Sequence, residues 1–235
     1  QHVPFELDEL SLDWQILRST ADGESIQVAA VPIGLITTYC DALEQAGIAS
    51  VGIVPASLAS LNTLQTPKEA GTLRVVVLLE RSLTTIMGLA GDRLLLTTTT
   101  EYGTGARIHA ILKQELSLDD VEAQKTLRLC GVDPTVSRGI VRKALSAELE
   151  QLNTLVQHMR QFLEQEQKQP CALLEITGEE AQLKALDQEL GQLTGIETRV
   201  APPALTMTFH AHKDSVLTLG SSTVAIGAAL YPQQH

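Results

Sequence analysis

The residues that could perform chemistry are few and widely spaced in this sequence. It contains no GxxxxGK phosphate loop followed by Ser or Thr, no HExxH, no GxSxG and no CxxC. Tyr102, Gly103, Thr104 and Gly105 form a Gly-rich segment where a strand is expected to turn into a helix. Backbone N–H groups at such a turn can receive an anion, although an ordinary turn explains the same residues.

Two further sets of residues have spacings that chemistry could use. His210 and His212 are two apart with Asp214 next in phase, which would place all three on one face of a strand. We expect no metal there, because the sequence offers no convincing third zinc ligand. Glu122 and Lys125 are three apart and would share a helix face. An intrahelical ion pair is the default interpretation of this spacing, and a ligand contact is the alternative.

The elements before residue 66 predict a small α/β module. Alternating apolar residues predict a strand over 10–17, and a second strand follows the Asp22-Gly23 turn. Pro32 suits the first turn of a helix, and Gly47 suits its end. The expected elements are strands at 10–17, 26–31 and 48–54 and helices at 32–47 and 55–64.

Residues 66–72 are the best linker candidate, because they combine Pro, Gly and charge without apolar periodicity. The pattern after the linker is that of an α/β domain with a hairpin-rich start. The expected strands are 73–80, 84–89, 93–100, 171–176 and 196–200, with further apolar segments at 216–219 and 224–230. The expected helices are 105–115, one capped by 117–120, a long one from 133–134 to 167, and 181–193.

Composition limits the classes of protein that fit. The chain has 235 residues, of which 44% are hydrophobic and only 3% aromatic, so a sizeable aliphatic core is expected and wholesale disorder is not. The net charge of −11 argues against a nucleic-acid-binding surface. No apolar run approaches the roughly 18 residues that span a bilayer. The three cysteines are far apart, which favours free thiols in a reducing compartment.

Charge is distributed unevenly along the chain. Up to Thr66 there are eight Asp or Glu residues and one base, Arg18. Such asymmetry marks a separate unit or a surface for a basic partner, and a solvated acidic face that aids solubility is the alternative.

Residues 2–10 read HVPFELDEL and residues 12–17 read LDWQIL. These segments resemble the YIPFPLDEV and LDYQVL of the PilM family of type IV pilus assembly proteins. The segments at 42–48, 55–59, 121–125 and 223–230 are similar to further family motifs and occur in the family's order. The resemblance implies an actin-like ATPase (ribonuclease H-like) α/β fold, related to the division protein FtsA, with a small α/β inserted subdomain. It assigns residues 1–66 to that acidic subdomain and 73–235 to the actin-like domain, with a helical insertion at about 117–168.

The same resemblance marks where nucleotide motifs are degenerate. Leu78 stands where the family's Asp would organise Mg²⁺, and Glu80 stands where a Gly lets the backbone approach phosphate. Glu179 and Glu180 replace two glycines of the adenosine motif. A carboxylate beside a polyphosphate is repulsive. Among the family's nucleotide contacts, only Glu122, Lys125 and Gly178 are matched.

The resemblance therefore implies a non-enzymatic scaffold of type IV pilus or type II secretion assembly, with no catalytic residues and no cofactor. The family's phosphate-binding first lobe is not in this sequence, and we expect an N-terminally incomplete chain. ATP and Mg²⁺ remain possible only if that lobe is intact, and an active ATPase is the alternative function.

The implied partner is the cytoplasmic N-terminal peptide of a PilN-like inner-membrane protein, together with other pilus inner-membrane assembly proteins. The inserted subdomain would help to form the peptide groove, with Asp8, Glu9, Asp13 and Glu44 as candidate contacts. Membrane-proximal peptides carry Lys or Arg under the positive-inside rule, which the acidic subdomain suits. The expected location is the cytoplasm at the inner membrane, with membrane contact through the partner and none with nucleic acid.

Overall fold

The computed structural model describes residues 6–20, 23–49, 52–64, 71–201 and 228. The chain separates into two compact units, the smaller ending at Pro55 and the larger beginning at Ala56. The division therefore falls before the expected boundary at residues 66–73. Consequently the short helix α2 (Ala56–Leu61) belongs with the larger unit.

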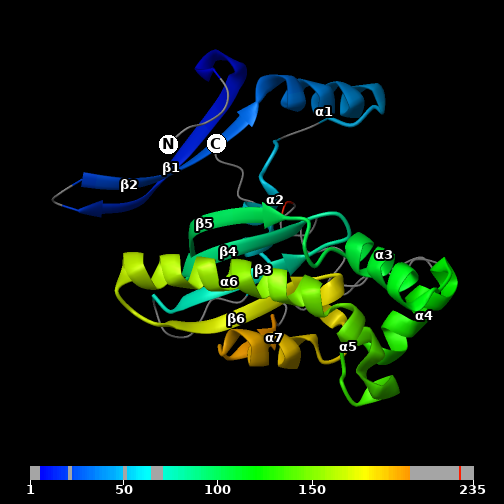
Figure 1. Ribbon diagram of the computed structural model, residues 1–235. Coiled ribbons are helices and arrows are strands. Elements are labelled where there is room, and N and C mark those ends of the chain that lie inside the picture. Colours follow the sequence, from blue (N-terminus) through cyan, green and yellow to red (C-terminus); the bar gives the residue numbers. More distant parts are fainter. Residues whose placement is uncertain (1–5, 21–22, 50–51, 65–70, 202–227, 229–235) are drawn as a thin grey trace. The chain divides into compact units, whose positions relative to one another are not determined.

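The smaller unit is a β-hairpin followed by a helix (Figure 1). A 3₁₀ turn η1 (Leu7–Glu9) leads into β1 (Leu10–Thr20), which pairs antiparallel with β2 (Gly23–Pro32). Helix α1 (Ile33–Gln45) starts directly after Pro32, and Gly47 beyond its end adopts φ +73°. The strand predicted at 48–54 was wrong for its described residues, which form no strand. An apolar run becomes a strand only where another strand supplies hydrogen bonds, and Ile48 and Ile53 are exposed.

The larger unit is built on a mixed five-stranded sheet with the order β5-β4-β3-β6-β7. β4 is antiparallel to both β3 and β5, whereas β6 runs parallel to β3 and to β7. All five strands lie at the predicted places, which confirms the α/β pattern. Their bounds are β3 (Leu73–Leu79), β4 (Thr84–Ala90), β5 (Arg93–Thr100), β6 (Cys171–Gly178) and β7 (Thr198–Val200).

Helices cover one face of this sheet and fill the main core (Figure 1). Alternate residues of β3, including Val75 and Val77, point to this face and are fully buried. Helix α6 crosses β4 where Gly88 leaves room, since a Cβ there would lie 2.8 Å from the side chains of Met159 and Leu163. The covering helices are α6 (Ser146–Gln167) and α7 (Leu186–Thr194), whereas α3 (Gly105–Leu116), α4 (Asp120–Cys130) and α5 (Ile140–Ala144) lie beside one end of the sheet (Figure 1).

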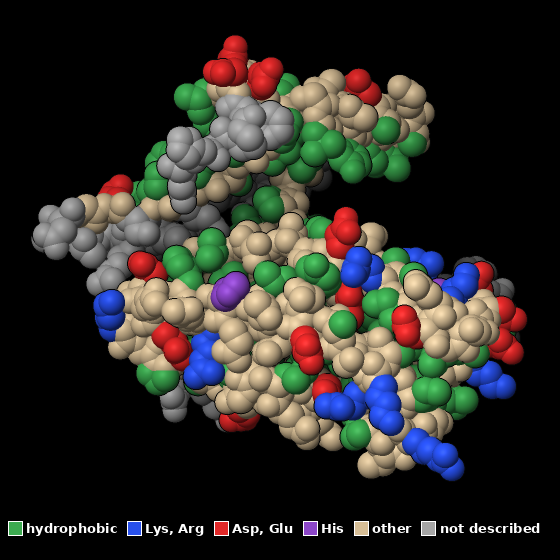
Figure 2. Space-filling view, viewed as in Figure 1, with side chains coloured by type: hydrophobic (Ala, Val, Ile, Leu, Met, Phe, Trp, Pro, Cys, Tyr) green, Lys and Arg blue, Asp and Glu red, His purple; other side chains and the backbone are tan. Residues whose placement is uncertain are grey.

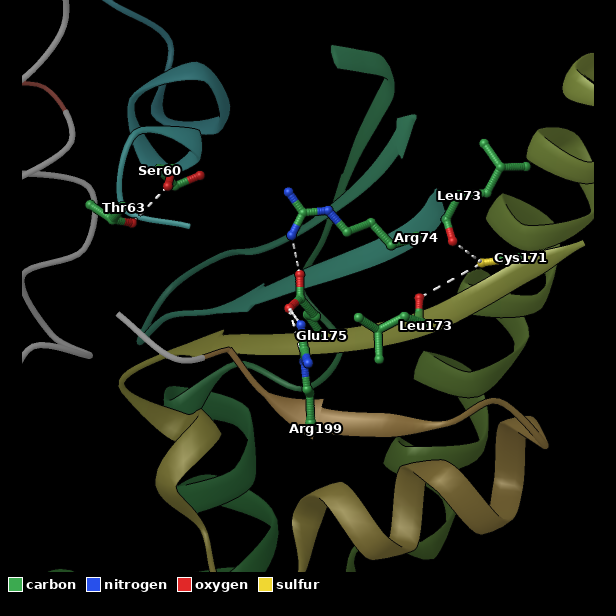
Figure 3. Close-up of polar contacts among 8 residues, drawn as sticks. All are labelled: Ser60, Thr63, Leu73, Arg74, Cys171, Leu173, Glu175 and Arg199. Atoms are coloured by element: carbon green, nitrogen blue, oxygen red, sulfur yellow. Dashed lines mark hydrogen bonds and ion pairs between the residues drawn. The ribbon is translucent and has the colours of Figure 1, made fainter. Parts of the chain in front are cut away.

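The opposite face of the sheet carries a second apolar cluster and a buried ion triad. Val76, Leu78 and Met87 belong to this cluster, against which Leu58 and Leu61 from the region of α2 pack. Figure 3 shows Glu175 of β6 between two arginines of neighbouring strands, Arg74 and Arg199. Arg74 and Glu175 are almost completely buried, and Arg199 donates from Nη2 to Glu175 Oε1 at 2.8 Å. A buried carboxylate such as that of Glu175 is stable in the interior only while its charge is paired and its oxygens accept hydrogen bonds.

The long helix predicted from residues 133–134 to 167 was wrong as a continuous element. It is divided into a 3₁₀ turn η2 (Val136–Gly139), α5 and α6. Ser137, Arg138 and Gly139 have left-handed backbone angles, with φ of +47°, +57° and +67°. Apolar periodicity does not detect this break, because the core-facing residues keep their spacing on both sides of it.

The helix predicted at 181–193 also begins later than expected. Residues Glu180–Gln182 form a 3₁₀ turn η3, and Ala185 has φ +63° before α7 starts. The backbone is held out of a helix by long-range contacts, since Val132 donates its N–H to the Lys184 carbonyl at 2.9 Å. The Lys184 ammonium also pairs with Asp133 at 2.8 Å and, with the Thr135 hydrogen bonds, lowers the pKa of Asp133 to about 2. The apolar segment at 216–219 and, apart from residue 228, that at 224–230 lie outside the described residues.

Ala185 provides a test of this local geometry. An L-residue in the left-handed region is strained by about 1 kcal/mol, which glycine avoids. We expect Ala185→Gly to raise the free energy of unfolding by about 0.5–1 kcal/mol in urea melts. Ala110→Gly, at an exposed site within α3, is the control and should lower it by about 1 kcal/mol. Equal destabilisation by both substitutions would contradict the left-handed assignment.

Candidate functional site

The candidate site lies at the carboxyl ends of β3 and β6, where two parallel strands finish side by side. Leu79 is paired with Gly178 at this edge. Gly178 has φ +99°, and a Cβ on it would lie 2.2 Å from the Leu79 carbonyl oxygen. The backbone of the sheet itself therefore requires a glycine at this position. Gly178 was predicted as a nucleotide contact.

Leu78 fills a place in the core rather than at a ligand surface. Its side chain is completely buried, in the cluster that contains Val76 and Met87. A carboxylate at this position would have to be desolvated among aliphatic side chains. Leu78, which stands where the resemblance places the Mg²⁺-organising Asp, thus contributes to hydrophobic packing.

Glu80 begins the loop that joins β3 to β4. Its N–H donates to the Leu83 carbonyl at 3.3 Å, and its carbonyl accepts the N–H of Gly105 at 3.1 Å. The side chain is partly buried, and desolvation raises the pKa of the Glu80 carboxyl. The carboxylate is therefore held at the edge of the sheet in a poorly solvated place.

Glu180 approaches the same helix start from the other strand. A Cβ on Gly105 would lie 2.0 Å from Glu180 Oε1, so the carboxylate packs directly against this glycine at the first residue of α3. Burial, and then the charge of Glu179, raise the pKa of Glu180, while Arg81 and His109 oppose the shift. The structure thus brings Glu80 and Glu180, two of the degenerate motif positions, together around Gly105.

The Gly-rich turn before α3 does hold an anion, but the anion is the chain's own Glu148. The N–H of Gly103 donates to Glu148 Oε1 at 2.8 Å, and the Arg107 guanidinium donates to both carboxylate oxygens at 2.8 and 3.0 Å. These hydrogen bonds raise the pKa of Arg107. Glu148 is only 5% exposed, so the turn is closed by a buried internal carboxylate.

Glu122 and Lys125 are both exposed residues of α4. Glu122 forms a capping box with Asp119, in which each side chain accepts the other residue's N–H. The expected ion pair between Glu122 and Lys125 is not among the ion pairs of the described residues. No hydrogen bond within the described ranges joins either side chain to Gly178.

Two further expectations concern metals and membranes. His210, His212 and Asp214 lie outside the described residues. Within the described part of the chain, no group of three or more His, Cys, Asp or Glu residues is arranged to hold a metal ion. The same residues contain no helix that is long and apolar enough to cross a bilayer.

The candidate partner residues of the smaller unit are all exposed, but they do not form one face. Asp8 and Glu9 precede β1, Glu44 lies in the last turn of α1, and Asp13 accepts the N–H of Trp14 at 2.8 Å. Side chains alternate along a strand, so Asp13 faces away from the neighbouring apolar residues.

Sequence reasoning missed an exposed apolar ladder on the hairpin. Trp14 lies opposite Val28, and Ile16 lies opposite Ile26, which places all four on one face with Leu12. These five side chains are 48–62% exposed, and of the described residues in this unit only Leu10 is buried. The alternating pattern was visible in the sequence, but the exposure of this face among the described residues of the unit was not. Hydrophobic side chains also gather along α1 in Figure 2.

The sequence profile described as Type IV pilus assembly protein PilM matches residues 1–233. The chain belongs to the PilM family. The family prediction made from the sequence motifs is thereby confirmed. A search of curated protein sequences gave no significant match.

Solved structures support the actin-like fold of this PilM family member. The "PilM-PilN type IV pilus biogenesis complex" is similar with a TM-score of 0.72 and 21% identity, over 97% of this chain and 68% of that one. EutJ from Carboxydothermus hydrogenoformans has a TM-score of 0.56 and 17% identity, over 81% and 58% of the two chains. MreB5 of Spiroplasma citri bound to ADP has a TM-score of 0.63 and 10% identity, over 86% and 65%. The predicted fold class is confirmed, and the chain spans about two thirds or less of these proteins.

Glu180 provides a test of the crowded carboxylates. The pKa of Glu180 is raised above its value in the unfolded chain, so protonation of Glu180 favours the folded state. The contribution of this carboxyl to the free energy of unfolding is therefore lost as the pH rises through the raised pKa. We expect Glu180→Gln to raise the melting temperature at pH 7, by on the order of 1–2 °C, and the gain to vanish near pH 4. Glu150→Gln, on the exposed side of α6, is the matched control. A pH-independent effect of Glu180→Gln would contradict the assignment.

Proposed function

We propose that this chain is a non-enzymatic platform of type IV pilus assembly, or of the related type II secretion system. In this proposal it holds the N-terminal peptide of a PilN-like inner-membrane protein. The observation that carries the proposal is the apolar ladder of Leu12, Trp14, Ile16, Ile26 and Val28, which is exposed in a strongly acidic unit. A contiguous exposed apolar surface rimmed by charge is typical of a protein interaction site.

The chemistry of the smaller unit fits a peptide that combines apolar and basic residues. Apolar side chains of the peptide would cover the ladder and supply most of the affinity. Asp8 and Glu9, exposed beside the start of β1, would attract the Lys and Arg residues that accompany cytoplasmic membrane-proximal segments. The similarity to the PilM-PilN complex supports a PilN-like partner.

Two features favour a platform over an ATPase. The Glu180 carboxylate packs against Gly105, and the backbone carbonyl of Glu80 takes the N–H of Gly105, where a polyphosphate would have to approach the strand ends. Leu78 is embedded in the core, so a metal-organising side chain is absent at that position. An ATP-binding protein of the same fold is the alternative, and the exposed Lys125 on α4 is the observation that keeps it open.

We place the protein in the cytoplasm at the inner membrane, held there by its PilN-like partner. Other inner-membrane assembly proteins of the pilus would be its further partners. No cofactor is needed for this role, because binding and positioning require only a stable surface.

The ladder can be tested by peptide binding to the full chain. Trp side chains that a partner covers on binding are frequent hot spots, so we expect Trp14→Ser to weaken binding of a fluorescent PilN-type peptide at least tenfold. Phe162→Ser removes a 38% exposed aromatic side chain from the larger unit and is the control, with binding unchanged. Equal binding by Trp14→Ser and the unsubstituted chain, measured by anisotropy at low salt, would overturn the proposed surface.

A further inference from the structure

A second surface of opposite charge lies on the larger unit. Residues 121–145 contain five Lys or Arg and two Asp or Glu, whereas the rest of the chain has 12 Lys or Arg and 26 Asp or Glu. This basic segment comprises most of α4, the turn η2 and α5. Figure 2 shows its Lys and Arg side chains gathered over α4 and α5.

Four cations of this segment are exposed and have no acidic partner among the described residues. Lys125 and Arg128 lie on α4, Arg138 lies in the left-handed turn, and Lys143 lies on α5. None of them is in an ion pair with another described residue. Arg142 differs, because its Nε pairs with Glu189 at 2.6 Å.

Two aliphatic side chains stand among these cations. Leu129 is 64% exposed and Ile140 is 45% exposed. The end of α4 is tied to the turn before α5 by the contact of Cys130 Sγ with Ser137 Oγ at 3.6 Å. We call Arg128, Leu129, Arg138, Ile140 and Lys143 the α4–α5 basic surface.

We propose that the α4–α5 basic surface docks on an anionic lipid bilayer. It lies on short helical segments at one end of the larger unit (Figure 1). Cations interspersed with projecting aliphatic side chains suit the bilayer interface, where the head groups are charged and the outer acyl region accepts apolar groups.

The charge distribution makes this contact directional. An anionic bilayer repels the remainder of the chain, which is acidic, and attracts this surface. The contact is independent of the peptide-binding role and would add a second, direct attachment to the one through a PilN-like partner. Two weak attachments together bind more tightly than either alone.

Co-sedimentation of the full chain with vesicles tests the proposal. We expect binding to vesicles of phosphatidylcholine with 30% phosphatidylglycerol, and none to pure phosphatidylcholine or in about 0.5 M NaCl, where charge is screened. Each exposed cation contributes about fivefold to such binding, so Arg138→Gln with Lys143→Gln should weaken it more than tenfold. Arg160→Gln with Lys168→Gln removes the same charge from α6 and its end, and should bind as the unsubstituted chain does.

Each other outcome overturns the proposal. Failure to bind anionic vesicles at low salt does so, as does equal weakening by the two double variants. Concentration-dependent self-association that Arg138→Gln with Lys143→Gln abolishes, without vesicle binding, assigns the surface to a second copy instead. Trp14→Ser should keep full vesicle binding. A failure of the peptide-binding proposal can therefore be distinguished from a failure of the membrane-docking proposal.

Discussion

The parallel pairing of β3 with β6 is the constraint on which the larger unit depends. It joins segments about a hundred residues apart in the chain and places Leu79 against Gly178 at the shared end of the two strands. The pairing also aligns Arg74 with the buried Glu175, which a third strand completes through Arg199. Because this interior carboxylate needs both arginines, a shift of either strand would leave a buried charge unpaired.

The same pairing determines what can stand at the candidate site. The loops that follow β3 and β6 both arrive at the start of α3, where the backbone carbonyl of Glu80 accepts the N–H of Gly105 and the Glu180 carboxylate packs against Gly105. A helix start favours negative charge, so one anion is accommodated there, and the raised pKa values of both carboxyls reflect their poor solvation. At the neighbouring Gly-rich turn, Glu148 already satisfies Gly103 and Arg107. We interpret this edge of the sheet as filled by the chain's own acidic groups, while binding surfaces lie elsewhere.

Local patterns in the sequence predicted the fold well where local forces decide it. Alternation and continuous apolar runs located β3 to β6, and the acidic residues after Ser117 located the capped start of α4. The misses arose from long-range contacts. The Lys184 carbonyl is taken by Val132, which delays α7, and the left-handed turn at Ser137 to Gly139 interrupts an unbroken apolar periodicity. For the site, the nucleotide-contact positions stay predictions, and Glu148 could not be linked to Gly103 from sequence, since 45 residues separate them.

We propose that the actin-like fold is kept here as a binding platform, with carboxylates and hydrocarbon at positions of the family's nucleotide motifs. Thermal melting of the full-length protein with and without saturating Mg·ATP tests it most directly. A ligand that binds only the folded state raises the melting temperature in proportion to its affinity. We predict no change with Mg·ATP. A rise of several degrees that disappears in Lys125→Ala would contradict the claim and establish the alternative, an ATP-binding member of the same fold.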